Sequence, residues 1–208
     1  VGSEMCIRDR PKRPVAAIVG GAKVSTKLKV LENLIEKVDL LILGGGMANT
    51  FLLAEGMEIG ASLVETDMVE TAEAIRGKAA ARGCRIILPC DFLVAQELAV
   101  GAPHRVVGHG EVAGSDMILD AGPLSASQVA TDLAGCRTIV WNGPLGAFEF
   151  SPFDSATNIV ARAVADLTAE GRLLSVAGGG DTLAALANAG VGNQFSYVST
   201  AGGAFLEW

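Results

Sequence analysis

Two lysines that follow a glycine pair are the first residues of this chain whose types and spacing suggest chemistry. The apolar run Val15–Val19 leads directly into Gly20 and Gly21, and Lys23 and Lys27 come next. This order predicts a buried strand, a tight loop and a helix with two positive charges near its start. The first turn of a helix has free N–H groups and the positive end of the helix dipole, so it suits a phosphate. Two solvated lysines are the simpler alternative, but their place directly behind a strand and a glycine turn favours phosphate binding.

Further glycine clusters follow other apolar runs, at residues 44–46, 178–180 and 202–203. Asp181 and Thr182 come directly after the second of these clusters, where the pattern predicts the start of a helix. Asp181 could simply cap that helix. Alternatively it could hold Mg²⁺ on bound phosphates while backbone N–H groups bind the phosphates themselves.

The segment 141–149 reads as a rigid Pro/Gly turn after a strand, and it carries Asn142 and Glu149. Taken alone, such a turn says little about function. The two histidines, His104 and His109, lie in an irregular stretch, where a surface position is the simpler interpretation than a catalytic one.

The common nucleotide and metal motifs are not found in the sequence. It has no G-x-x-x-x-G-K-[ST] and no H-E-x-x-H, which excludes a P-loop and the usual zinc-protease helix. The dinucleotide fingerprint also fails, because Asn49 stands where the third glycine would be. Four cysteines, at positions 6, 84, 90 and 136, have no C-x-x-C spacing and are expected to be incidental or buried thiols in a reducing cytosol.

Composition favours a folded domain with a large core. Half of the 208 residues are hydrophobic and 19% are charged, while the 26 glycines cluster after apolar runs. The net charge of −7 argues against a nucleic-acid partner. No apolar run reaches about 18 residues, so no membrane span is expected.

Strand and helix patterns alternate along the chain from Pro14 onward. Strands are expected at about 15–19, 39–43, 85–88, 138–141, 172–176 and 195–198. Helices are expected after a cap at Ser25, at 47–54, at 66–82 with Gly83 ending it, from a cap at Ser125 to 133, at 157–167 and at 181–188, with a further one beginning at Ala204. Residues 91–123 are less regular, with short strands at 92–95 and 105–107.

This alternation predicts an α/β fold: an open, doubly wound, mostly parallel six-stranded sheet with helices on both faces, like a Rossmann fold. Ligands of such sheets bind at the carboxyl ends of the strands, where every glycine cluster falls. Residues 1–13 are interpreted as a leader of doubtful origin, and residues 14–208 as one nucleotide-binding domain.

Six segments together resemble the phosphoglycerate kinase family, and they occur in that family's order. They are GGAKVSTK at 20–27, GGGMANTF at 44–51, IGASL at 59–63, WNGPLGAFE at 141–149, GGGDT at 178–182 and STAGGAFLE at 199–207. The resemblance covers only the family's C-terminal, nucleotide-binding domain. It implies that an N-terminal domain with the basic patch for the glycerate phosphate is missing, and that the chain is truncated at both ends.

The resemblance implies reversible phosphoryl transfer between 1,3-bisphosphoglycerate and Mg-ADP, giving 3-phosphoglycerate and ATP in glycolysis. By carry-over, Lys23 neutralises the transferring phosphoryl group, and the N–H groups of Gly202 and Gly203 face it. Lys27 holds the nucleotide phosphates, and Asp181 binds Mg²⁺.

The remaining carried-over residues surround the nucleotide. The amides of Gly179 and Gly180 contact phosphate together with Thr182, Asn142 is also assigned to nucleotide binding, and Glu149 takes the ribose hydroxyls. The adenine slot is lined by Gly21, Gly45, Gly46, Leu63 and Pro144.

Two positions depart from the family's pattern, because Ala201 and Ala156 stand where the family usually has glycine. The first bears on the transfer step and the second on packing. A stand-alone adenine-nucleotide binding module without catalysis is the alternative function, and a dinucleotide-dependent dehydrogenase ranks lower. The protein is expected to be a cytoplasmic monomer that binds neither nucleic acid nor membrane.

Overall fold

A computed structural model of the chain describes residues 11–199. The expected glycine turn at 202–203 and the helix expected at Ala204 therefore lie outside the described residues. Within the described part, no helix is both long and apolar enough to cross a membrane.

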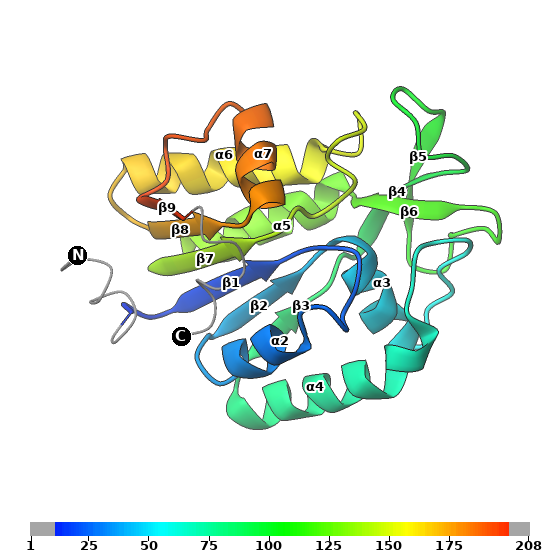
Figure 1. Ribbon diagram of the computed structural model, residues 1–208, viewed down its shortest axis with the longest axis horizontal. Helices are drawn as coiled ribbons and strands as arrows, with labels where there is room; N and C mark the ends of the chain where they lie inside the picture. Colours follow the sequence, from blue (N-terminus) through cyan, green and yellow to red (C-terminus); the bar gives the residue numbers. More distant parts are fainter. Residues whose placement is uncertain (1–10, 200–208) are drawn as a thin grey trace.

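A six-stranded parallel sheet forms the centre of the molecule (Figure 1). Its strands, in chain order, are β1 (Val15–Val19), β2 (Leu40–Leu43), β3 (Arg85–Ile87), β7 (Thr138–Asn142), β8 (Leu174–Gly178) and β9 (Tyr197–Ser199). Their order across the sheet is β3-β2-β1-β7-β8-β9, and every neighbouring pair is parallel. The predicted fold class is thus confirmed.

Helices cover both faces of this sheet (Figure 1). One face carries α2 (Leu28–Leu34), α3 (Gly45–Ala54) and α4 (Val69–Arg82), the last preceded by the 3₁₀ turn η1 (Thr66–Met68). The other face carries α5 (Pro123–Ala134) and α6 (Ser155–Ala169), with α7 (Gly180–Asn188) packed against α6.

Strand β1 shows why the sheet needs both layers. Ala16 and Ile18 belong to the core under α5 and α6, while Val15, Ala17 and Val19 belong to the core under α2, α3 and α4. All five side chains are fully buried. A strand covered on both faces is read as a continuous apolar run, which is how the sequence presents it.

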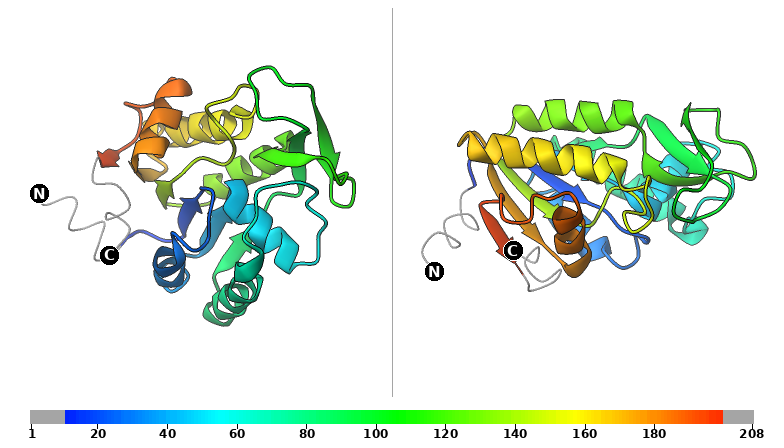
Figure 2. Two further views of the ribbon diagram at one scale, coloured as in Figure 1. Left: turned by 45° about the vertical axis from the view of Figure 1, so that its right-hand side comes forward. Right: turned by 90° about the horizontal axis from the view of Figure 1, so that it is seen from above.

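A small antiparallel sheet lies beside one end of the molecule, near α3 and α6 (Figure 2). Its order is β5-β4-β6, built from β4 (Asp91–Ala95), β5 (His104–Gly108) and β6 (Met117–Ala121). The sequence predicts the first two strands but not β6. A polar residue, Asp120, interrupts its apolar pattern, yet that side chain is buried and accepts the N–H of Ala156 at 2.9 Å, near the start of α6.

Two serines expected to cap helices have other partners. Helix α2 begins only at Leu28, with Lys27 at its N-cap position, and Ser25 instead donates its N–H and its hydroxyl to Glu65. Lys23 and Lys27 therefore lie in the loop before α2 rather than on its first turn. In these bonds Ser25 is a donor to a distant carboxylate, whereas a capping serine accepts a helix N–H through its hydroxyl oxygen.

Helix α5 shows the same effect. Gly122 is its N-cap and Pro123 its first residue, so Ser125 lies inside the helix and donates its hydroxyl to the carboxylate of Asp91 at 2.5 Å. By contrast, Gly83 ends α4 in the left-handed conformation, with a φ of 74°, as the sequence predicts.

Residues just before β1 are tied to the sheet. The carbonyl of Lys12 accepts the hydroxyl of Thr138 at 2.8 Å, and Arg13 pairs with Asp39 at 3.0 Å. Asp39 also accepts the N–H of Val15 at 2.7 Å. The start of the central strand is thus fixed from two neighbouring strands.

The loops after β1 and β7 approach so closely that their glycines are required for packing. A Cβ on Gly20 would lie 1.7 Å from the carbonyl oxygen of Pro144. Gly143 has a φ of +97°, and a Cβ there would lie 2.2 Å from the carbonyl oxygen of Gly20. Neither neighbour is a flexible side-chain end, so the backbone itself would have to move.

We therefore expect Gly20→Ala to lower the free energy of unfolding by about 3 kcal/mol or more, because it overpacks two backbones. The matched control is Gly77→Ala on the exposed face of α4, where a Cβ meets nothing within 4 Å. That change should stabilise by roughly 0.5–1 kcal/mol. Urea denaturation of the two variants measures both effects, and equal stabilities would contradict the close approach.

Candidate functional site

The carboxyl ends of β1 and β7 form the point where the sheet's connections diverge. From β1 the chain turns towards β2, and from β7 it turns the opposite way towards β8. In open parallel sheets the crevice that binds ligands lies at this point. The glycine clusters at 20–21, 44–46 and 178–180 all follow strands at this edge.

Backbone hydrogen bonds join the first two of these loops to the loop after β7. Gly20 donates its N–H to the carbonyl of Asn142 at 2.9 Å, and Gly45 donates to the carbonyl of Leu145 at 2.9 Å. Met47, in the first turn of α3, donates to the carbonyl of Gly21 at 3.0 Å. The three loops therefore form one assembled surface rather than three independent turns.

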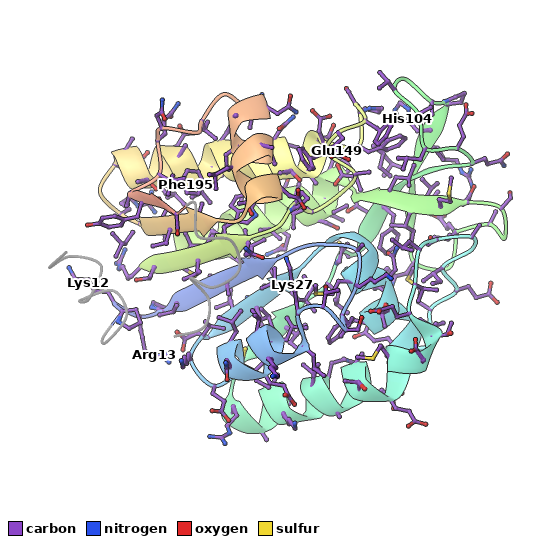
Figure 3. The ribbon with its side chains drawn as sticks, in the orientation of Figure 1. Lys12, Arg13, Lys27, His104, Glu149 and Phe195 are labelled. Atoms are coloured by element: carbon purple, nitrogen blue, oxygen red, sulfur yellow. The ribbon has the colours of Figure 1, made fainter. Side chains whose placement is uncertain are left out.

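Lys27 lies at the ends of the two diverging strands and contacts residues of both (Figure 3). Its ammonium donates to the carbonyl of Gly20 at 2.5 Å, and to the side-chain and backbone oxygens of Asn142 at 2.7 and 3.3 Å. Burial lowers the pKa of Lys27 to about 8, while the negative charge of Asp181 acts in the opposite direction. A partly buried amine near a carboxylate at a strand-end crevice is suited to bind an anionic ligand.

Asn142 links this lysine to the next strand. Its amide nitrogen donates to the carbonyl of Gly178 at 2.8 Å, at the end of β8. This bond turns the amide oxygen towards Lys27. The buried Asn142 thus positions the lysine across the β1–β7 boundary.

The start of α7 lies at the same edge of the sheet, directly after β8. Gly179 is the N-cap, with a φ of 97°, and the helix begins at Gly180, whose surroundings are open where a Cβ would point. Asp181 is exposed and makes no capping hydrogen bond, so capping does not account for it. The hydroxyl of the buried Thr182 accepts the N–H of Gly143 at 2.7 Å, which ties this helix start to the loop after β7.

The residues assigned to an adenine slot also gather, around the start of α3. A Cβ on Gly45 would lie 2.7 Å from the carbonyl of Gly21, and one on Gly46 would lie 3.0 Å from the side chain of Leu63. Leu63 is 56% exposed, so its side chain is accessible beside the start of α3. Pro144 is buried against Gly20.

Two further assigned side chains, Lys23 and Glu149, are exposed. Lys23 is exposed in the loop before α2. Glu149 is exposed in the loop before α6, well away from Lys27 (Figure 3), and makes no hydrogen bond or ion pair with any residue in 11–199. Gly202, Gly203 and Ala201 lie outside the described residues.

The single carboxylate of Asp181 suits a metal ion that is also held by a bound ligand. Within residues 11–199 no group of three or more histidine, cysteine, aspartate or glutamate side chains could hold an ion by itself. Mg²⁺ is commonly bound by one or two carboxylates together with substrate phosphates and water. The single free carboxylate of Asp181 at the helix start fits that role.

The histidines make ring contacts, and two of the three described cysteines are buried, whereas Cys90 is exposed. His109 stacks on Phe92 with ring centroids 5.4 Å apart, and His104 packs edge-on against Phe153. Cys84 and Cys136 are buried free thiols, and burial raises the pKa of each to about 11. None of these residues lies among the loops of the crevice.

Comparison with known proteins decides the family. A sequence model of the family described as phosphoglycerate kinase matches residues 4–208. The chain belongs to the phosphoglycerate kinase family. It is 62% identical over 199 residues to the phosphoglycerate kinase of Rhodospirillum centenum, and 59% identical over 200 residues to that of Xanthobacter flavus. Each match covers 96% of this chain and 50% of the relative.

Solved phosphoglycerate kinases share the fold. The structure from Coxiella burnetii superposes with a TM-score of 0.93 at 46% identity, covering 98% of this chain and 51% of that one. The structure from Pyrococcus horikoshii gives a TM-score of 0.81 at 30% identity, covering 99% and 51%. The chain therefore spans about half the length of the phosphoglycerate kinases it matches.

Sequence reasoning missed one contact at the edge of the site. Glu65 receives two hydrogen bonds from Ser25, two residues after Lys23. The only sequence signal is that Glu65 lies two residues after the end of the IGASL segment at 59–63. Nothing in that spacing points to a partner 40 residues earlier.

The lowered pKa of Lys27 makes a direct prediction. Asp181→Asn removes the charge that favours the ammonium, so the pKa of Lys27 should fall below about 8. NMR titration of the lysine ε-groups, assigned with Lys27→Arg, measures the midpoint, and Asp166→Asn on the exposed face of α6 is the control that should leave it unchanged. The pKa of Lys27 is about 8 in the folded chain and 10.5, the ordinary lysine value, in the unfolded chain. Between these two pH values the unfolded chain binds more protons, so the free energy of unfolding should increase as pH rises through that window. An unchanged midpoint in Asp181→Asn would contradict this assignment.

Proposed function

We propose that this chain is the nucleotide-binding half of a phosphoglycerate kinase, with residues 14–208 forming that domain. The complete enzyme would transfer a phosphoryl group reversibly between 1,3-bisphosphoglycerate and Mg-ADP, giving 3-phosphoglycerate and ATP. The observation that carries the proposal is the Lys27–Asn142 contact at the diverging ends of β1 and β7, facing the start of α7, in a chain of this family.

The arrangement supports distinct roles for the charged groups. Lys27 would hold the nucleotide phosphates, because its ammonium is already fixed at the crevice by carbonyl and amide oxygens. The N–H groups of Gly179 and Gly180 lie at the start of α7, where an anion is favoured. Lys23, which is exposed and less constrained, would neutralise the transferring phosphoryl group.

Asp181 would hold Mg²⁺ against the phosphates, where the metal would supply positive charge to the phosphate oxygens. The protein's own part is to place the groups and neutralise charge, which is most of what phosphoryl transfer requires. Gly21, Gly45, Gly46, Leu63 and Pro144 would line the adenine slot, and the exposed Glu149 would take the ribose hydroxyls. Thr182 would act beside the phosphates, and Gly202 and Gly203 would face the transferring group.

The glycerate substrate would be held by the other half of the complete enzyme. We further propose that the enzyme acts in glycolysis, in the cytoplasm and as a monomer. The adenine nucleotide and the glycerate phosphates would then be its partners.

Calorimetry with Mg-ADP tests the nucleotide site. Lys27→Ala and Asp181→Ala should each weaken binding by about tenfold or more, since each removes a charged contact worth about 1.5–3 kcal/mol. Lys29→Ala is the matched control, because Lys29 is an exposed lysine on α2 and should bind like the unchanged chain. If the unchanged chain binds no Mg-ADP, the proposed nucleotide site is wrong.

A coupled kinase assay tests the division of labour. The chain alone should give negligible turnover with 1,3-bisphosphoglycerate and Mg-ADP, because positioning of the second substrate would come from the other half. Binding of Mg-ADP without turnover would agree with the proposal. Full kinase activity from this chain alone would overturn it.

A further inference from the structure

One carboxylate outside the assigned site residues joins two of the loops around the crevice. Glu65 accepts the N–H of Ser25 at 3.0 Å through one oxygen and the hydroxyl of Ser25 through the other. Ser25 lies two residues from Lys23 and two from Lys27. Glu65 itself lies two residues from Leu63. Its side chain therefore connects the loop at 20–27, called here the lysine loop, to the loop that carries Leu63.

Glu65 is held in place by a helix. Its N–H donates to the hydroxyl of Thr50 at 3.2 Å, and the carbonyl of Leu63 accepts the amide of Asn49 at 3.1 Å. Thr50 and Asn49 are neighbouring buried residues of α3. The carboxylate is therefore a fixed point that belongs to the framework of the sheet, although it lies near the surface.

The middle of the lysine loop makes few other hydrogen bonds to the rest of the described protein. Its start is fixed by the bond from Met47 to the carbonyl of Gly21, and its end by Lys27. Between them, Val24 buries its side chain in the core, and the hydroxyl of Thr26 bonds only within the loop, to the carbonyl of Lys23 at 2.9 Å. The polar connection of the middle of the loop to the rest of the described protein is thus Glu65.

The surroundings of Glu65 keep it ionised. Burial acts to raise its pKa, but the hydroxyl of Ser25, the N–H groups of Ser25 and Val24, and the charge of Lys23 together bring the pKa below its ordinary value. A carboxylate has two oxygens that can accept both donors of Ser25, whereas a glutamine presents one oxygen and one NH₂ group. The contact therefore depends on a carboxylate, not merely on a polar side chain.

We propose that Glu65 is a positioning residue that sets the lysine loop so that Lys23 meets the transferring phosphoryl group. The inference rests on the proposed function. It separates two lysines of one loop: Lys23 depends on Glu65 through Ser25, while Lys27 is held by Gly20 and Asn142. The transferring phosphoryl group is present on ATP and not on ADP, so the two nucleotides report on the two lysines separately.

The test compares Mg-ATP and Mg-ADP affinities by calorimetry. Glu65→Gln should weaken Mg-ATP by about fivefold to tenfold, as expected for a lost charged hydrogen bond that acts through a neighbour, and Mg-ADP by less than about twofold. Glu58→Gln is the matched control, because Glu58 is an exposed glutamate in the same connection and should change neither affinity. Ser25→Ala removes the hydroxyl donor and leaves the N–H donor, so it should give a smaller loss of Mg-ATP affinity in the same direction, and it keeps the test available if Glu65→Gln folds poorly.

The difference between the Mg-ATP and Mg-ADP effects is the readout that a purely structural role would not produce, and an NMR titration tests the Ser25–Glu65 contact directly. The chemical shift of the Ser25 amide proton should change with pH as Glu65 ionises, because this proton is hydrogen-bonded to the carboxylate. The midpoint of the change should lie below the pKa of an ordinary glutamate. In Glu65→Gln this pH dependence should vanish, while Glu65→Asp should restore part of both the pH dependence and the Mg-ATP affinity.

The outcomes separate this inference from the function on which it rests. If the unchanged chain binds neither nucleotide, the proposed function fails and this inference with it. If the unchanged chain binds both and Glu65→Gln weakens both equally, or weakens neither, the inference alone is overturned.

Discussion

The structure depends on the close approach of the backbones that leave β1 and β7. Gly20 and Gly143 have no room for a Cβ. On Gly20 it would lie 1.7 Å from the carbonyl oxygen of Pro144, and on Gly143 it would lie 2.2 Å from the carbonyl oxygen of Gly20. This contact fixes where the two halves of the sheet diverge. It also creates the position at which Lys27 can reach carbonyl and amide oxygens from both strands.

The site is built outward from that contact. Asn142 extends it to β8 through the carbonyl of Gly178, and Thr182 brings the start of α7 against Gly143. On the other side, the third loop joins through the bond from Gly45 to Leu145. Because each connection uses buried backbone or a buried side chain, the crevice is largely formed by the framework, and preorganised donors are what charge stabilisation in phosphoryl transfer needs.

The glycine clusters serve two purposes that the sequence does not separate. Gly180 lies at a helix start with open space beside it, which suits the approach of a ligand. Gly20, Gly45 and Gly143 are instead enclosed by neighbouring backbone, so their lack of a side chain is a packing requirement. Similar glycine motifs thus have different physical reasons within one site.

The sequence was enough to predict the sheet, most helices and the family, because apolar runs and helical periodicity are local and the six motifs stand in a fixed order. It placed β1 at its observed bounds and ended α4 at Gly83. It could not place the true start of α2, the strand β6 or the role of Glu65. Near each of these places a carboxylate bonds to a residue far along the chain: Glu65 with Ser25 and Asp120 with Ala156. Only the tertiary structure decides such pairs, since a local pattern records which groups can donate or accept but not which distant partner the fold brings to them.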